Sequence, residues 1–217
     1  MSETTETRHS YDRVADRYAT EIGDELTGKP LDRALLAALA EFGAGGPVLD
    51  VGCGPGQAAA ELAGRGARPV GLDLSPAMCA LATRATGLPC CVADMTALPV
   101  RSAAVAAIVC LYAVIHLDAP GRAAAYAEFA RVLRPGGSAL IAFHTRDAET
   151  PSGQARTHTD WWGHPVALTF RFLDPAAEVA ALARAGLTLT ARLDRQPDPD
   201  REHASERCYL LVRRPAG

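Results

Sequence analysis

Short runs of apolar residues alternate along the chain with longer segments whose apolar positions recur at helical spacing. Several of the short runs end at a Gly or Asp residue, and few polar residues interrupt them, as in buried strands of a parallel sheet. The longer segments place apolar residues three or four positions apart, which predicts amphipathic helices. This alternation is typical of βαβ units arranged around a largely parallel sheet.

Seven strands and six helices follow from this pattern. The strands are expected at 47–51, 68–73, 89–92, 105–111, 138–143, 187–193 and 207–212. Helices are expected at 8–23, 30–42 and 57–64, and after the caps at Ser75, Asp118 and Asp174, each followed closely by a Pro. We therefore predict an α/β, Rossmann-like fold: a seven-stranded, mostly parallel sheet with an antiparallel last strand, helices on both faces and a small N-terminal helical cap.

The segment after the fifth expected strand is less regular. Residues 144–165 are polar and contain two Trp and three His, so they are expected to form an irregular loop. Residues 166–172 then alternate strictly between apolar and polar side chains, which predicts a half-buried strand. The turn at 134–137, Arg-Pro-Gly-Gly, is expected to separate the helix after Asp118 from the fifth strand.

Composition narrows the class of protein. The chain has 217 residues and a formal net charge of −3, with no long basic run, so no nucleic-acid partner is expected. No segment approaches the roughly 18 apolar residues that a membrane span needs. The six Cys have mostly apolar neighbours and no zinc-ligand spacing, which indicates reduced thiols and a cytoplasmic location.

The strongest local signal is a glycine-rich turn between a strand and a helix. Glycines occupy positions 52, 54 and 56, directly after the strand at 47–51. Glycine lets the backbone turn tightly and approach a ligand, and the following helix adds the positive end of its dipole. The dinucleotide fingerprint requires its third glycine at position 57, where this chain has Gln, and Pro55 removes an amide donor. A ligand with a ribose but no phosphate fits this loop better than a dinucleotide does.

Two acidic residues follow the next two strands. Asp73 ends the second strand, 23 residues after Asp50, close to the offset at which an acid reaches a ribose. Its carboxylate can accept hydrogen bonds from both ribose hydroxyls. Asp94 follows the third strand, where it can accept from an exocyclic amine of adenine.

Together these motifs resemble the class I S-adenosylmethionine-dependent methyltransferases over nearly the whole chain. The loop from Asp50 to Gly56 resembles the first motif of that family, and Asp73 resembles its acidic strand end. Asp94 and Met95 resemble the adenine motif, and the turn at 135–137 resembles the one before the fifth strand. The segment at 11–19 resembles the entry helix of the small-molecule members.

The resemblance implies a cofactor, a site and a division of the chain. It implies one domain, 1–217, with cap helices at 1–43, a cofactor-binding half at 47–143 and a substrate-side half at 144–217. The cofactor is expected to be S-adenosylmethionine, with S-adenosylhomocysteine as product. Its expected contacts are Tyr11, Tyr18, Asp50, Gly52, Cys53, Gly54, Gly56, Asp73, Leu74, Met78, Asp94, Met95 and Leu111.

Methyl transfer from a sulfonium depends mainly on holding the nucleophile in line in a dry site. A base is needed only where the nucleophile loses a proton. His116 follows the fourth strand and His144 the fifth, so both are expected near the carboxyl edge where ligands bind. Each is a candidate base, or alternatively a polar wall of the site. The Asn/Asp-Pro-Pro-Tyr/Phe motif of the amino-methyltransferases is absent, which disfavours methylation of a nucleic-acid base.

The acceptor is expected to be a small molecule, bound by aromatic residues with polar tips. The candidates are Tyr112, Trp161, Trp162, His164 and Arg171. Alternatively, the Trp residues fill the core and Arg171 lies on the surface. His158, Asp160 and His164 have no standard zinc spacing, so no metal is expected.

The sequence leaves other functions open. The chain could be a relative of these enzymes that binds the cofactor without transferring its methyl group. A nicotinamide oxidoreductase is a further alternative, but the third glycine lies at position 56 and not at 57, which disfavours it. The atom methylated, whether O, N or C, is not determined, nor is the choice between monomer and homodimer. The small-molecule members of the family often serve secondary metabolism, and the resemblance extends that expectation to this chain.

Overall fold

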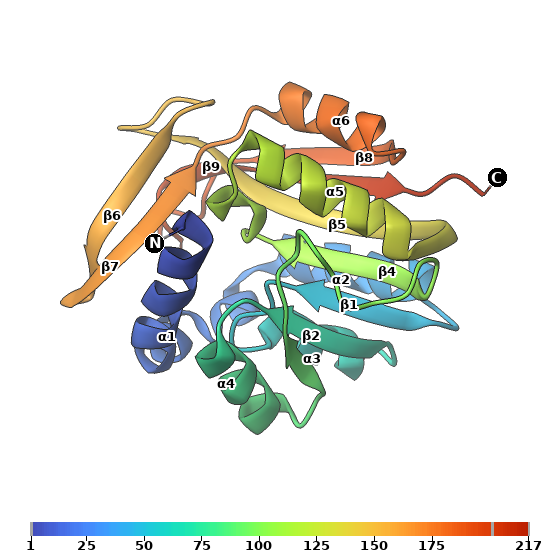
Figure 1. Cartoon of the computed structure of the whole chain (residues 1–217), viewed down its shortest axis with the longest axis horizontal. Coiled ribbons are helices and arrows are strands. Elements are labelled where there is room, and N and C mark those ends of the chain that lie inside the picture. The colour runs from blue at the N-terminus through green and yellow to red at the C-terminus, as the bar shows by residue number, and fades with distance from the viewer. Residues whose placement is uncertain (1, 201, 217) are drawn as a thin grey trace.

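The computed structural model describes residues 2–200 and 202–216. Figure 1 shows a twisted central sheet with helices on both faces. The sheet has seven strands in the order β3-β2-β1-β4-β5-β9-β8, and β9 runs antiparallel to both of its neighbours. The predicted sheet is therefore confirmed. No helix in the described part of the chain is long and apolar enough to cross a membrane.

The observed elements match most of the predicted ranges. The strands of the sheet are β1 (Pro47–Val51), β2 (Arg68–Asp73), β3 (Cys90–Val92), β4 (Val105–Leu111), β5 (Leu133–Asp147), β8 (Thr188–Arg195) and β9 (Ser205–Arg213). The helices are α1 (Glu3–Ile22), α2 (Pro30–Phe42), α3 (Gln57–Gly64), α4 (Pro76–Thr86), α5 (Ala119–Val132) and α6 (Pro175–Arg184). Short 3₁₀ turns lie at η1 (Glu25–Gly28) and η2 (Val114–His116).

Alternate residues of the central strands enter two different hydrophobic clusters. Leu49 and Ile108 pack with the buried side chains of α5 and α6, whereas Val48 and Val109 pack with those of α2 and α3. This division follows from the two-residue period of a strand. Both faces of β1 and β4 are therefore buried, which is why their sequences are almost entirely apolar.

The prediction of an irregular loop at 144–165 is wrong. Residues 144–147 extend β5, and residues 155–161 form β6 (Ala155–Trp161), which pairs antiparallel with β7 (His164–Arg171). The turn between them is Trp162-Gly163, and both residues have positive φ, 54° and 79°. Two consecutive residues in the left-handed region make a tight hairpin turn. Trp rarely occupies such a position, so the sequence carries no clear signal for this turn. The strand expected at 166–172 is confirmed as β7.

The fifth strand is also longer than predicted. It begins at Leu133, directly after α5, so the turn at 134–137 is part of β5 and not a separate connection. Its pairing with β4 is interrupted between Val105 and Ala107, where the extra residues are accommodated as a bulge. Pairing with β9 then stabilises β5 as far as Asp147.

Helix α1 closes the carboxyl edge of the sheet. It lies between the β6–β7 hairpin and α4 (Figure 1). Ser10 Oγ accepts a hydrogen bond from the Ala167 amide at 2.9 Å, and Asp12 Oδ1 accepts one from Ser75 Oγ at 2.6 Å. The helix therefore bridges the hairpin and the start of α4 and covers the strand ends between them.

Candidate active site

The glycine loop at 52–56 turns the chain sharply between β1 and α3. Gly52, Gly54 and Gly56 have φ values of 73°, 52° and 92°, a region that other residues enter only with strain. A Cβ on Gly52 would lie 2.2 Å from the Cβ of Ala113. At Gly54 the nearest atom to such a Cβ is in Tyr18, 3.9 Å away. The backbone at Gly54 therefore borders open space in which a ligand can approach it.

Asp73 holds this loop in place from the end of β2. Its Oδ2 accepts from the Gly54 amide and its Oδ1 from the Ser75 amide, both at 2.8 Å. Burial raises the pKa of Asp73, and these amide hydrogen bonds oppose the increase. Each carboxylate oxygen retains a lone pair for a further donor. Asp73 thus organises the loop and can still accept from a ligand.

Asp50 anchors the start of α3. Its Oδ2 accepts from the Ala59 amide at 3.0 Å, near the positive end of the α3 dipole. Burial raises the pKa of Asp50 to about 7, although the Ala59 amide lowers it. The side chain is 2% exposed, so its main contact is with the protein itself.

A cavity of about 460 Å³ opens at the carboxyl ends of β1, β2 and β4. Its lining includes twelve of the thirteen expected cofactor contacts: Tyr11, Tyr18, Asp50, Gly52, Cys53, Gly54, Asp73, Leu74, Met78, Asp94, Met95 and Leu111. Gly56 does not line it, contrary to expectation. A Cβ on Gly56 would lie 3.2 Å from the Cβ of Ala82 and 3.1 Å from Thr86, so this glycine lets α3 pack closely on α4.

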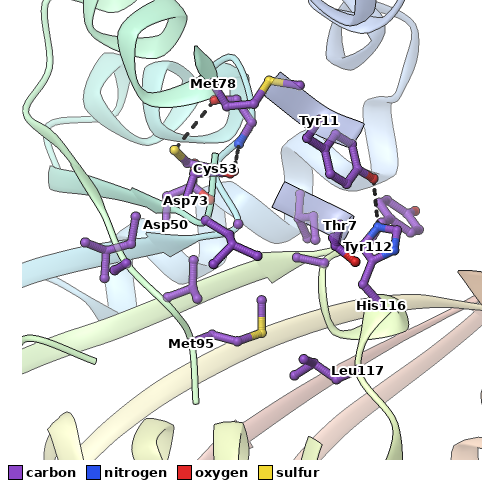
Figure 2. A pocket seen from close by; sticks show the side chains of 18 of the residues that line it. Thr7, Tyr11, Asp50, Cys53, Asp73, Met78, Met95, Tyr112, His116 and Leu117 are labelled. Atoms are coloured by element: carbon purple, nitrogen blue, oxygen red, sulfur yellow. Dashed lines mark hydrogen bonds between the residues drawn. The ribbon is translucent and has the colours of Figure 1, made fainter. Parts of the chain in front are cut away.

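The cavity continues from the glycine loop to His116. Figure 2 shows Cys53, Asp50 and Asp73 on one side of it, and Tyr11 with His116 on the other. His116 Nδ1 lies 3.0 Å from the carbonyl oxygen of Thr169, and its Nε2 lies 2.7 Å from Tyr11 Oη. A carbonyl oxygen can only accept, so Nδ1 carries the proton and the neutral ring presents a lone pair at Nε2.

Burial keeps this imidazole neutral. It lowers the pKa of His116 to about 4, assisted by the nearby charge of Arg171 and opposed by the Thr169 carbonyl and Glu3. At neutral pH the ring is therefore a hydrogen-bond acceptor at Nε2, and Tyr11 donates to it. This pair has the geometry of a base with a fixed tautomer.

Tyr112 lines the same end of the cavity and begins a buried polar network. Its hydroxyl lies 2.6 Å from that of Tyr209, which donates to Asp32 Oδ1 at 2.8 Å. Arg195 donates to Asp32 Oδ2 at 3.1 Å and to the Tyr209 hydroxyl. Tyr112 itself has a φ of 58°, an unusual conformation for a bulky residue that often marks a functional site.

Sequence reasoning missed several residues of the lining. Asp32 occupies the buried face of α2 together with Leu36 and Leu39, and an acid on an apolar helix face is a detectable signal. Thr7 lines the cavity from α1, and Gln57 lines it at the start of α3. The Gln57 Oε1 atom is buried without a hydrogen-bond partner. Neither residue has a distinctive spacing in the sequence.

Four of the five expected substrate contacts lie outside the cavity lining. Trp161 and Trp162 stack on each other, with ring centroids 4.4 Å apart, and pack behind Tyr11 and Tyr18. His164 is exposed beside the hairpin turn. Arg171 donates to the His116 carbonyl at 2.8 Å and to Glu3 at 2.7 Å.

His144 also lies outside the lining, in contrast to His116. Its ring stacks on Tyr112 with centroids 4.8 Å apart, and its Nδ1 lies 2.8 Å from Ser205 Oγ. Burial lowers the pKa of His144 to about 3, with Arg207, His203 and Lys29 adding to the decrease. This geometry makes it a support for Tyr112, one layer behind the cavity.

His144 should make folding sensitive to acid. The ring takes up a proton near its usual pKa of 6.5 when unfolded, but only near pH 3 when folded. The native state therefore loses stability as the pH falls below 6.5, by up to about 1.4 kcal/mol per pH unit. We expect the stability difference between the wild type and His144→Phe to narrow by that amount per unit from pH 6 to about pH 4 in denaturant titrations. A constant difference across this range would contradict the buried, neutral ring.

Residues 48–137 match the family described as a methyltransferase domain. A magnesium protoporphyrin IX methyltransferase from Synechocystis PCC 6803 with bound S-adenosylhomocysteine is 16% identical, with a TM-score of 0.73, covering 98% of this chain and 100% of that one. The match region contains the glycine loop, Asp73, Asp94 and His116.

Two further solved structures have the same fold. The 4+2 cyclase SpnF is 20% identical, with a TM-score of 0.71, covering 99% of this chain and 97% of that chain. A geranyl diphosphate C-methyltransferase from Streptomyces coelicolor A3(2), in complex with Mg²⁺, geranyl diphosphate and S-adenosylhomocysteine, is 17% identical. Its TM-score is 0.64, covering 86% of this chain and 80% of that chain.

Proposed function

We propose that the chain is a class I S-adenosylmethionine-dependent methyltransferase that methylates an O, N or C atom of a small-molecule metabolite, releasing S-adenosylhomocysteine. One observation carries this proposal: a single cavity joins the glycine loop and Asp73 to the neutral, acceptor side of His116. The volume of about 460 Å³ lies within the range of small-molecule sites.

The lining residues fit the cofactor chemically. Asp73 has lone pairs left for ribose hydroxyls, and the space beside Gly54 admits a ligand close to the backbone. The orphaned Gln57 Oε1 is an acceptor that the cofactor's ammonium group would satisfy. Asp94 would accept from adenine, and Leu74 and Met78 line the same cavity. Tyr11 and Tyr18 would cover the sulfonium end.

The cofactor, when bound, supplies an electrophilic methyl group whose bond to the sulfonium sulfur breaks with the electron pair passing to sulfur. The protein holds the nucleophile in line and keeps water out, with α1 and the hairpin closing the strand ends. His116 Nε2 can accept the proton that the nucleophile loses through the Tyr11 hydroxyl, which lies 2.7 Å away. Thr169 keeps Nδ1 protonated, so that the lone pair remains on the cavity side.

The activity can be tested by incubating the protein with S-adenosylmethionine and a panel of phenols, alcohols and amines. Formation of S-adenosylhomocysteine above the protein-free control supports the proposal. Binding of S-adenosylhomocysteine without turnover of any panel member would favour the second candidate, a relative that binds the cofactor without methyl transfer. The likeness to a cyclase over 99% of the chain gives that alternative a specific basis.

His116→Gln is expected to lower kcat by about 10²-fold or more with the best acceptor of this panel, because a Gln amide can accept a hydrogen bond but cannot take up the proton as Nε2 does. The affinity for S-adenosylhomocysteine, measured by calorimetry, should change by less than about twofold, since His116 lies at the far end of the cavity from Asp73.

The matched control for this variant is His9→Gln. His9 lies on α1 in a part-exposed position and does not line the cavity. Its kcat should equal that of the wild type. An unchanged kcat in His116→Gln would remove His116 from the chemistry.

A further inference from the structure

The hydrogen-bond directions at the His116 end of the cavity are fixed by the surrounding protein. His116 Nε2 can only accept a hydrogen bond, so Tyr11 donates its single hydroxyl proton to that atom. The Tyr11 oxygen therefore offers only lone pairs to a further group. Thr7 adds a hydroxyl that can donate or accept.

The same reasoning fixes the direction at Tyr112. The Tyr209 hydroxyl donates its single proton to the carboxylate of Asp32. Tyr112 must then be the donor in its 2.6 Å contact with Tyr209. A ligand that reaches the Tyr112 oxygen therefore also meets an acceptor.

The charges around the cavity point the same way. Seven acidic residues line it, namely Glu3, Glu25, Asp32, Asp50, Asp73, Asp94 and Asp118. No Arg or Lys is among the described residues of the lining. Three nearby cations lie behind the lining and are already paired: Lys29 with Glu25, Arg195 with Asp32, and Arg171 with Glu3. An anionic ligand would find no free side-chain cation to balance its charge.

From these directions and charges we propose that the methyl acceptor is an uncharged or cationic molecule that presents an O–H or N–H group to the hydroxyl oxygens of Tyr11 and Tyr112. This inference rests on the proposed methyl transfer and names its substrate class. The bond formed joins the donor's oxygen or nitrogen to the methyl carbon and the bond from that carbon to sulfur breaks. The displaced proton passes to the Tyr11 oxygen while Tyr11 gives its own hydroxyl proton to His116 Nε2. Carboxylates and phosphate esters are excluded as acceptors.

Three probes with the same phenol group but different charges test the inference. Tyramine is cationic, 4-hydroxybenzyl alcohol is neutral and 4-hydroxybenzoate is anionic at pH 7.5. Calorimetry with the full chain saturated with S-adenosylhomocysteine should show tyramine and the alcohol binding at least about tenfold tighter than 4-hydroxybenzoate. Anisole, which has no donor, should bind more weakly than phenol. Aniline against phenol, both neutral at this pH, then separates nitrogen from oxygen donors.

Each outcome of these binding measurements either supports or overturns the acceptor inference. Tighter binding of 4-hydroxybenzoate, equal binding of the three probes, or no binding of any of them would overturn the acceptor inference while leaving cofactor binding intact. Failure to bind S-adenosylhomocysteine at all would instead remove the proposed function together with the inference. Tyr112→Phe provides a second check, because it should weaken binding of the alcohol about three- to tenfold without changing the affinity for S-adenosylhomocysteine. Unaltered binding of the alcohol would remove Tyr112 from the acceptor site.

Discussion

Replacing Arg195 by methionine is expected to lower the free energy of unfolding by about 3–5 kcal/mol, since it leaves the buried carboxylate of Asp32 without its cation and removes two charged hydrogen bonds from Glu202. Arg195 donates two hydrogen bonds to Glu202, at 2.6 and 2.7 Å, and one to Asp32 at 3.1 Å. The side chains of Asp32 and Glu202 are 2% and 1% exposed. Burial alone would raise the pKa of Glu202. Its contacts, of which the hydrogen bond from Arg195 has the largest effect, lower this pKa to about 2.

Arg192→Met is the matched control for this variant. Arg192 also lies on β8 and pairs with an acid, Asp194, at 2.8 Å, but both side chains are largely exposed to solvent. An exposed pair contributes less than about 1 kcal/mol, so the control should unfold almost like the wild type in urea. An equal decrease in the free energy of unfolding of the two variants would show that the buried network around Asp32 does not stabilise the fold as proposed.

Replacing Asp73 by alanine is expected to weaken binding of S-adenosylhomocysteine by about 10- to 100-fold, or about 1.5–3 kcal/mol. The substitution removes a charged acceptor for the ribose hydroxyls. It also frees the Gly54 and Ser75 amides, which hold the glycine loop against the end of β2. Both losses act on the same ligand, so the effect should exceed that of deleting one hydrogen bond.

Two further variants complete the Asp73 experiment. Asp16→Ala removes an acid on α1 whose side chain is 95% exposed, so it should bind S-adenosylhomocysteine like the wild type. Asp73→Asn retains an acceptor oxygen but loses the charge, and it should give an intermediate affinity. Calorimetry gives the dissociation constants directly. Wild-type affinity in Asp73→Ala would contradict the assignment of the ribose to this residue.

The positions of the strands could be predicted from the sequence because each depends on residues that follow one another along the chain. The run at 105–111 is apolar at consecutive positions, which only a strand buried on both faces satisfies in an α/β protein. The caps Ser75, Asp118 and Asp174 were recognised for the same local reason, and each accepts an amide hydrogen bond at the start of its helix. The hairpin of β6 and β7 was missed because its turn places Trp162 in a conformation that few sequences use.

The cofactor end of the site could also be predicted from local order. Parallel strands bring their carboxyl ends to one edge, so the glycine loop after β1 and Asp73 at the end of β2 had to meet there. The acceptor end could not be predicted in this way. His144 lies near the end of β5, and His116 lies at the end of η2, shortly after β4. Only His116 lines the cavity, and the sequence alone does not distinguish the two.

The sequence by itself determined the order of strands and helices, the glycine turn and the acid beside it, because these depend on contacts within one βαβ unit. Only the tertiary structure decided the hydrogen-bond directions on which the acceptor inference rests. Tyr11 and His116 are 105 residues apart, and Tyr209 and Asp32 are 177 apart. No local pattern encodes such contacts, since they form only where α1, α2 and β9 pack around the completed sheet.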